Sequence, residues 1–592
     1  MLIPSQFMTK APSKKLPFAS KWLVTLVRFY VMLHFPKGNY FCHKCKVGGC
    51  GEHKQTDAGF RSMFETSSPR SAAETLTELH TQVELACNGV KAAVEAWQTS
   101  TSMKDLYRGY WIDDLLKRFH RLKKANLNLD RAEITQQLQD WVKQNESIIY
   151  NPFLSVKGFD VSKDTPIEIL HTILLGVVKY KWHGSHTSWN PTKKETYTLC
   201  LQATNTIGLS IASIQANYIM QFANSLIDQQ FKQVAQTCLF HMHDLVDAPQ
   251  FEIWKVLGEL LPLLWYPEID DMDQYLLDVE TAISNILDIF VILDPIKILA
   301  KNELHILVHA EADICCHGPL LHVQTESFEC FNVIFRSCSI LSNHLAPSCD
   351  ITHQLVHQEG LKHHLTGGWW LFSLTGEWEY AGWAVRDFLS QHPILQSLLG
   401  WTSPTELEQG SVKLMPLKWV KGQPTPSCQN FTLAQTEAKS SMNIHSYDIT
   451  TMWQRCVHVI SKSHDICPVL SWVYAISPVT KEPISTTSSR ALLALLSSSM
   501  FFVFQTLLII PLTNIEFIFN VQHNCYTAKC TATGSQAKKQ EWVDSNISES
   551  FIEHQPLEEH IINTTAFHNA HLLRCCLPPS TWAPLPLFAL ED

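Results

Sequence analysis

The sequence predicts a mainly helical α+β protein with a small β-rich C-terminal region. Apolar residues recur at helical spacing through much of 70–345, and N-cap residues precede several of these runs. Between 445 and 535 the apolar runs are shorter and strand-like. The chain has 592 residues, of which 45% are apolar and 17% charged, a composition typical of globular domains and not of disordered chains.

Shifts in composition and pattern divide the chain into six segments, more than the roughly three or four units that its length suggests. The segments are 1–36 without a matched pattern, 37–60 rich in Gly and Cys, 61–300 helical, 301–402 with a Trp-rich end, 403–440 read as a linker, and 441–592 rich in strands.

Two helix starts carry specific signals. Ser71 is an N-cap residue before a run with Leu76, Leu79 and Val83 at helical spacing. Thr165 to Glu168 form a capping box with Pro at the first helical position, which predicts a helix running through Val178. We also expect helices over Leu199 to Gln236 and Tyr275 to Phe290.

The C-terminal region combines expected strands with one ambiguous apolar run. Val457 to Ile460 and Trp472 to Ile476 read as strands. The run 491–515 has no charged residue and is long enough to cross a bilayer, but three serines, Gln505 and Pro511 weaken that interpretation. We favour buried strands or a core helix and keep a single membrane span as an alternative.

A Cys-rich string is the first candidate metal site. Cys42 and Cys45 have the spacing that lets two thiolates share one metal ion, and Cys50 and His53 follow closely. Four such ligands suit tetrahedral zinc, although the spacing is tighter than that of common zinc knuckles. The alternative is a set of uncoordinated or partly matched thiols.

His305 and His309 stand at i and i+4, which places both imidazoles on one face of a helix. Such a face can bind metal, but Ile306 stands where a zinc protease needs Glu, so the protease interpretation fails. A polar helix stripe is the simpler alternative.

The charge pattern limits the partners. A net charge of −10 argues against a protein that coats nucleic acid by charge alone. A local basic patch is either a solvated helix face or a phosphate-contacting face; it consists of Lys117, Arg118, Arg121, Lys123 and Lys124. No P-loop, dinucleotide fingerprint or serine-hydrolase elbow occurs in the sequence, so these enzyme classes lose support and no small-molecule substrate is expected.

Six strings taken in order resemble transposase-derived proteins of mushroom-forming fungi related to CACTA (En/Spm) elements. The Kyakuja–Dileera–Zisupton group is a neighbouring possibility. The strings are Lys37 to Gly49, Asp164 to Gly176, Leu304 to Pro319, Thr325 to Asn332, Ser342 to Ser348 and Asn520 to Cys525.

The resemblance implies a partial RNase H-like core with a large helical insertion. In such enzymes two Asp and one Glu hold paired Mg²⁺ ions for phosphoryl transfer. The resemblance points to Glu329 as the third acid, with Glu326 as second choice, and an ordinary helix N-terminal acid is the alternative for both. It also marks the family-motif positions Cys42, Cys45, Glu168, His171, His305 and His309.

The first two acids are missing from this chain, because residues 1–41 contain neither Asp nor Glu. We therefore expect an N-terminally truncated, degenerate relic without strand-transfer activity. Mg²⁺ is expected as a cofactor only in an intact relative. A domesticated nucleic-acid- or protein-binding module, with zinc and DNA as expected ligands, is the alternative. The start lacks a secretory pattern, so the expected location is nuclear or cytoplasmic, with reduced thiols.

Overall fold

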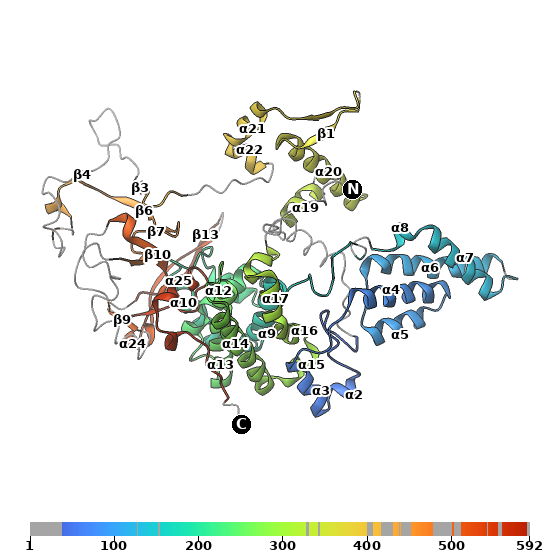
Figure 1. The fold of residues 1–592 in the computed structure, drawn as a ribbon. Coiled ribbons are helices and arrows are strands. Elements are labelled where there is room, and N and C mark those ends of the chain that lie inside the picture. Colours follow the sequence, from blue (N-terminus) through green and yellow to red (C-terminus); the bar gives the residue numbers. More distant parts are fainter. Residues whose placement is uncertain are drawn as a thin grey trace.

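The computed structural model describes residues 38–588 with internal gaps. The gaps are 127, 152–153, 155, 327–330, 341, 343, 374, 399–406, 416–429, 437–438, 440–451, 477–499, 503–510, 541–542 and 555–558. Helices dominate the described residues up to Leu365, and strands are concentrated in the C-terminal part (Figure 1). The predicted mainly helical α+β class with a small β-rich C-terminal region is thus confirmed.

A first helical unit lies to one side of the molecule (Figure 1). It comprises α4 (Ala72–Cys87), α5 (Lys91–Thr101), α6 (Leu106–Ala125), α7 (Arg131–Gln144) and α8 (Glu146–Ile149). Its own core packs Val83, Leu115 and Ile134, because the apolar residues of each helix recur on one face. The predicted cap is present: the Ser71 hydroxyl accepts from the Glu74 amide at 3.2 Å.

The second, larger helical unit surrounds the main core, which includes the fully buried Trp182 and Trp254. It comprises the π-helix η4 (Ile169–Val178), α9 (Lys179–His186), α10 (Pro191–Gln202), α11 (Ala216–Gln221), α12 (Asp228–His241), α13 (Ala248–Leu264), α14 (Met272–Leu293), α15 (Pro295–Ala300), α16 (Asn302–Ile306), η5 (Leu307–His309), α17 (Ala310–His317) and η6 (Leu320–Val323). The expected helix over Tyr275 to Phe290 lies within α14.

Two helix predictions need correction. The helix after Thr165 begins at Ile169 rather than at Pro166, because the Glu168 carboxylate caps it by accepting from the amides of Leu170 and His171. The segment Leu199 to Gln236 is not one helix either. It divides into the end of α10, α11 and the start of α12, and Gly208 in the intervening segment has a φ of +82°.

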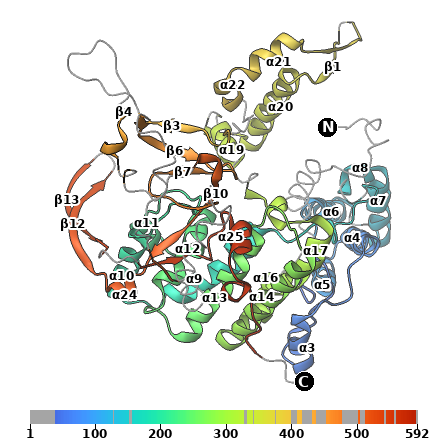
Figure 2. The same ribbon diagram turned by 60° about the vertical axis from the view of Figure 1, so that its left-hand side comes forward.

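An arm of helices and one strand pair projects from the helical units (Figures 1 and 2). It comprises α19 (Phe331–Ile340), α20 (Pro347–Leu365), β1 (Trp369–Leu371), β2 (Trp378–Tyr380), α21 (Trp383–Ser390) and α22 (Pro393–Leu398). β1 and β2 pair antiparallel, with Trp369 opposite Tyr380. Large aromatic side chains stay exposed on this arm, Trp383 at 74% and Trp378 at 62%.

The C-terminal region forms small antiparallel sheets. Its elements are β3 (Val412–Leu414), β4 (Asn430–Phe431), η7 (Leu433–Gln435), β5 (Trp453–Gln454), β6 (Cys456–Ile460), β7 (Ile466–Pro468), β8 (Trp472–Ala475), β9 (Met500–Phe502), η11 (Leu512–Asn514), β10 (Ile515–Phe519), β11 (Val521–His523), α24 (Cys525–Ala528), β12 (Ala532–Gln540), β13 (Val543–Ile552), β14 (Glu559–Ile562), α25 (Ala570–Cys576) and η12 (Pro579–Thr581). The orders are β3-β6-β7, β11-β14-β9, β10-β8, β12-β13 and β4-β5. β6 and β8 confirm the two strands expected from the sequence.

Only part of the ambiguous run 491–515 lies within the described residues. Met500 to Phe502 form β9 and pair with β14, and Leu512 to Asn514 form a short 3₁₀ turn before β10. Within the described part of the chain, none of the helices has the length and apolar character that a bilayer crossing requires.

Buried amide side chains join the C-terminal sheets to the larger helical unit. Asn520 is fully buried and donates to the carbonyls of Asn205 and Ile207 at 2.8 and 2.7 Å. Asn563, also fully buried, donates to the Gln236 carbonyl at 2.9 Å. These bonds connect the C-terminal sheets to backbone carbonyls of the helical unit, so they favour one docking geometry.

Candidate metal centre

The two cysteines of the 37–60 segment lie in a loop held by backbone contacts. Gly48 has a φ of +123°, and a Cβ there would come within 2.2 Å of the Asn39 carbonyl oxygen, so only glycine fits. The buried Arg70 guanidinium donates to the carbonyls of Cys42 and Tyr40 at 2.9 and 2.8 Å. The loop thus presents the thiols of Cys42 and Cys45 from a fixed backbone. It leads into α2 (Gly51–Lys54), α3 (Asp57–Arg61) and η2 (Ser62–Phe64).

The two histidines come from the helical segment of α16, η5 and α17. His305 and His309 are four residues apart, so their rings lie on one face, with centroids 5.3 Å apart. The His305 Nδ1–H donates to the Met63 carbonyl at 2.8 Å. That bond leaves the Nε2 lone pair directed at the cysteines, an arrangement that metal-binding histidines commonly share.

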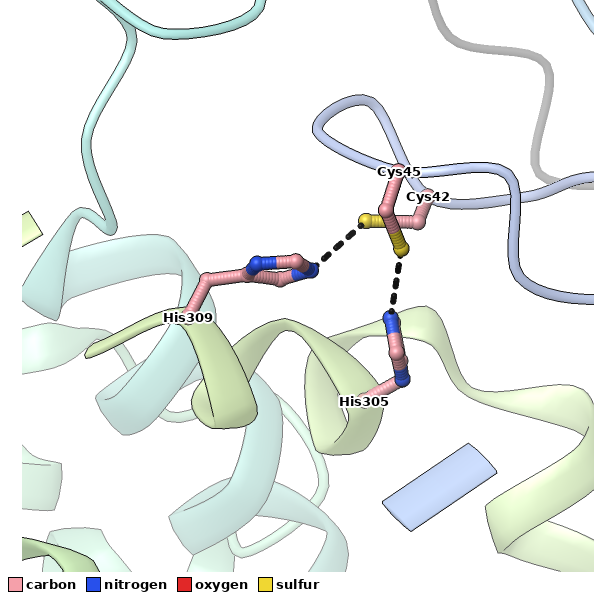
Figure 3. Close-up of side chains that lie close together, drawn as sticks. All are labelled: Cys42, Cys45, His305 and His309. Atoms are coloured by element: carbon pink, nitrogen blue, oxygen red, sulfur yellow. Dashed lines mark hydrogen bonds between the residues drawn. The ribbon is translucent and has the colours of Figure 1, made fainter. Parts of the chain in front are cut away.

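Folding brings these four side chains together (Figure 3). The Sγ of Cys42 lies 3.4 Å from the Nε2 of His309, and the Sγ of Cys45 lies 3.3 Å from the Nε2 of His305. A tetrahedral zinc with its usual bond lengths places sulfur and nitrogen ligands about 3.5 Å apart. All four ligand atoms lie within 4.8 Å of one another, so the donor set fits a zinc ion in both chemistry and spacing.

Burial and hydrogen bonding shift the pKa values of the two thiols. Burial raises the pKa of the Cys42 thiol well above its usual value. The hydrogen bond from Cys42 outweighs burial and lowers the pKa of the Cys45 thiol. Cysteine binds zinc as the thiolate, so loading this site would release whatever protons the two thiols carry.

A buried ion pair joins the cysteine loop to α17. The Nζ of Lys44 lies 2.6 Å from the Oδ1 of Asp313, and both side chains are largely buried. The Oδ2 of Asp313 also accepts from the Ile167 amide at 2.7 Å. Asp313, one turn beyond His309, thus fixes the cysteine loop and the start of η4, outside the group of four ligands.

The zinc set expected from the sequence is only half present. Cys42 and Cys45 belong to the group of four, whereas Cys50 and His53 are exposed and outside it. The positions that complete the set are His305 and His309. Their i, i+4 spacing signalled a metal face, but no sequence pattern linked that face to cysteines about 260 positions away.

Two other family-motif positions, Glu168 and His171, take part in hydrogen bonds that join separate segments. Glu168 is fully buried, and its carboxylate accepts from the His171 Nδ1 at 2.8 Å and from the Thr325 amide at 2.9 Å. It therefore ties the start of η4 to the segment that carries Glu326. Glu326 itself forms an ion pair with Lys232. Glu329 lies outside the described residues.

The expected basic patch lies on α6. Lys117, Arg121, Lys123 and Lys124 are exposed. Arg118 is half-buried, 2.5 Å from the Asp114 carboxylate, with its guanidinium 3.9 Å from the centre of the Trp141 ring. Arg121 is also near Asp114, at 3.7 Å, so this acid offsets part of the positive charge.

The comparisons with known proteins bear on the C-terminal region alone. A family described as a domain of unknown function, DUF8590, matches residues 417–504 and 495–582. None of the curated proteins and none of the solved structures compared with the chain matches it.

Proposed function

We propose that Cys42, Cys45, His305 and His309 bind one structural zinc ion that fastens the N-terminal loop to the larger helical unit. The observation that carries this proposal is the buried group of two thiols and two imidazoles from segments about 260 positions apart. Because protein ligands fill all four tetrahedral positions, the ion has no open position for a substrate, which is the arrangement of structural sites.

Metal analysis of the purified full chain tests this proposal. We expect Cys42→Ser and His309→Asn each to remove one equivalent of zinc and to lower the unfolding midpoint, because the binding free energy contributes to folding. The matched controls Cys50→Ser and His53→Asn replace exposed neighbours and should keep the full zinc content. Equal zinc in all four variants would refute the assignment.

At the level of the whole chain, we propose a transposase-derived protein with an RNase H-like ancestry and no strand-transfer activity. The ordered strings of the sequence support the origin. Among the described residues, the two groups that can hold a metal ion contain only Cys and His, whereas two-metal phosphoryl transfer relies on carboxylates.

A cleavage assay with element-end DNA and Mg²⁺ or Mn²⁺ tests the loss of activity. We expect no product. Robust cleavage that Glu329→Gln abolishes, while Glu326→Gln leaves it unchanged, would restore the enzyme interpretation.

The exposed basic residues of α6 favour a second candidate, a retained DNA-binding role. Asp114 forms ion pairs with Arg118 and Arg121. In the part of the chain that the structure describes, Lys117, Lys123 and Lys124 form no ion pair. Replacing the three lysines by Gln should weaken DNA binding uniformly across sequences and reduce the salt dependence by about three charges. A flat dependence of affinity on salt in the parent protein would exclude this mode.

A further inference from the structure

A second group of thiols and imidazoles lies in the C-terminal region. It consists of His523, Cys525, Cys530 and His554, whose ligand atoms all lie within 4.8 Å of one another. It comes from a different part of the chain than the first centre and falls within the stretch 495–582 that matches DUF8590. The sequence did not indicate a metal-binding role for these four residues.

Local structure brings three of the four side chains together. His523 ends β11, and Cys525 begins the short helix α24 two residues later. Lys529 then adopts a left-handed conformation with a φ of +53°, and the Cys530 amide donates back to the Cys525 carbonyl at 3.1 Å. This tight turn returns the second thiol to the first, so both sulfurs face the His523 ring.

The fourth side chain arrives from the end of the neighbouring hairpin. His554 follows β13, and its Nδ1 lies 3.4 Å from the Cys525 Sγ. The Nδ1 of His523 lies 3.5 Å from the same sulfur and 3.7 Å from the Cys530 Sγ. These separations match the sulfur–nitrogen spacing of about 3.5 Å in a tetrahedral zinc site.

The remaining nitrogen of His554 supports the metal assignment. Its Nε2–H donates to the Ala203 carbonyl at 3.1 Å, which fixes the tautomer with the Nδ1 lone pair toward the thiols. Ala203 caps the end of α10 in the helical unit. A metal at this position would therefore connect β11, the end of β13 and α10.

We propose that His523, Cys525, Cys530 and His554 form a second structural zinc site, which fastens the C-terminal sheets to the larger helical unit. Two thiolates and two imidazoles suit tetrahedral zinc, and they leave no open coordination position for catalysis. The three half-buried ligands and the exposed His554 place this site nearer the surface than the first centre.

Zinc content of full-length variants separates the two sites. The parent chain should hold two equivalents, and Cys525→Ser with Cys530→Ser should hold one. Cys42→Ser with Cys45→Ser should also hold one, so that failure of either site is visible independently of the other. His554→Asn changes an exposed side chain and tests the second site with little risk to folding. The matched controls Cys575→Ser and His464→Asn lie in the same region, outside both groups, and should retain two.

Alkylation of the unaltered chain provides a measurement that needs no variant. Zinc-bound thiolates are shielded, so a chelator should raise the labelling rate of Cys525 and Cys530 by about tenfold or more. The exposed Cys575 serves as the internal reference and should not change. Any of three results would overturn the proposal. These are unchanged labelling after chelation, a disulfide between Cys525 and Cys530 in the zinc-loaded protein, and an unaltered zinc content when Cys525→Ser and Cys530→Ser are combined.

Discussion

At the scale of single residues, polar groups outside the group of four position the candidate metal centre. Arg70 holds the cysteine loop through two carbonyls, and the Met63 carbonyl orients His305. Lys44 and Asp313 neutralise each other beside the site. Removing such a partner should therefore perturb the centre although it leaves every ligand in place.

The Lys44–Asp313 pair yields a first prediction. Asp313→Asn keeps an oxygen for the Ile167 amide but leaves the Lys44 charge buried and unpaired, so we expect a loss of about 3 kcal/mol in the free energy of unfolding. Urea unfolding measures this loss. Adding Lys44→Met to the Asp313→Asn variant should recover part of the lost free energy of unfolding. If the effects of the two substitutions on that free energy simply added, the result would contradict the coupling.

At the scale of elements, the π-helix η4 begins where it does because of one carboxylate. Glu168 caps the amides of Leu170 and His171 and also accepts from the Thr325 amide. The sequence located this helix start to within three residues but assigned the cap to Thr165. Glu168 also accepts from the Thr325 amide 157 positions away, a contact that local spacing does not encode.

Glu168→Ala should consequently loosen two segments at once. We expect faster amide hydrogen exchange at Leu170, His171 and Thr325, and a loss of about 2–3 kcal/mol, because three backbone amides lose their side-chain acceptor. Glu74→Ala changes the first turn of α4 on the separate helical unit and is the matched control. Exchange that stays protected at Thr325 in the Glu168 variant would show that this residue does not join the two segments.

Asp465 carries a pH-dependent contact between β7 and the start of α25. Burial raises its pKa, but hydrogen bonds from the His568 ring, the Ile518 amide and the Ser463 hydroxyl outweigh burial and lower it below the usual 3.8. A depressed folded-state pKa contributes stability that is present above 3.8 and is lost as the pH falls through the folded value. Measuring the free energy of unfolding as the pH is lowered should show this loss. Asp465→Asn should remove the part of the pH dependence that this carboxyl causes.

At the scale of the whole molecule, two helical units and the C-terminal sheets have separate apolar clusters. The range 61–300, treated as one segment from the sequence, contains residues of two of these clusters. The sheets attach to the larger unit through the amides of Asn520 and Asn563 and, as we propose, through the second metal ion. Polar contacts of this kind specify one docking geometry more strictly than apolar contacts do.

Asn520→Ala should weaken this docking. It removes the donor to the Ile207 carbonyl, a loss that costs about 1–3 kcal/mol, whereas the Asn205 carbonyl keeps the Gln522 side-chain amide at 2.8 Å. We expect faster limited proteolysis between α10 and α11, where those carbonyls lie, and little change in the first helical unit. Asn569→Ala, which removes donors to Asp465 and the Ile518 carbonyl within the C-terminal region, is the comparison variant.

The sequence by itself determined the fold class, the two strands near Val457 and Trp472, the Ser71 cap and the spacings of the Cys42–Cys45 and His305–His309 pairs. All of these are set by interactions between residues a few positions apart. Only the tertiary structure decided that the two pairs form one group of possible metal ligands, that Cys50 and His53 stay outside it, and that His523 and His554 face two further thiols. The physical reason is that a metal site requires ligand atoms to meet within a few ångströms, and for distant segments that meeting depends on packing and buried polar contacts along the whole chain.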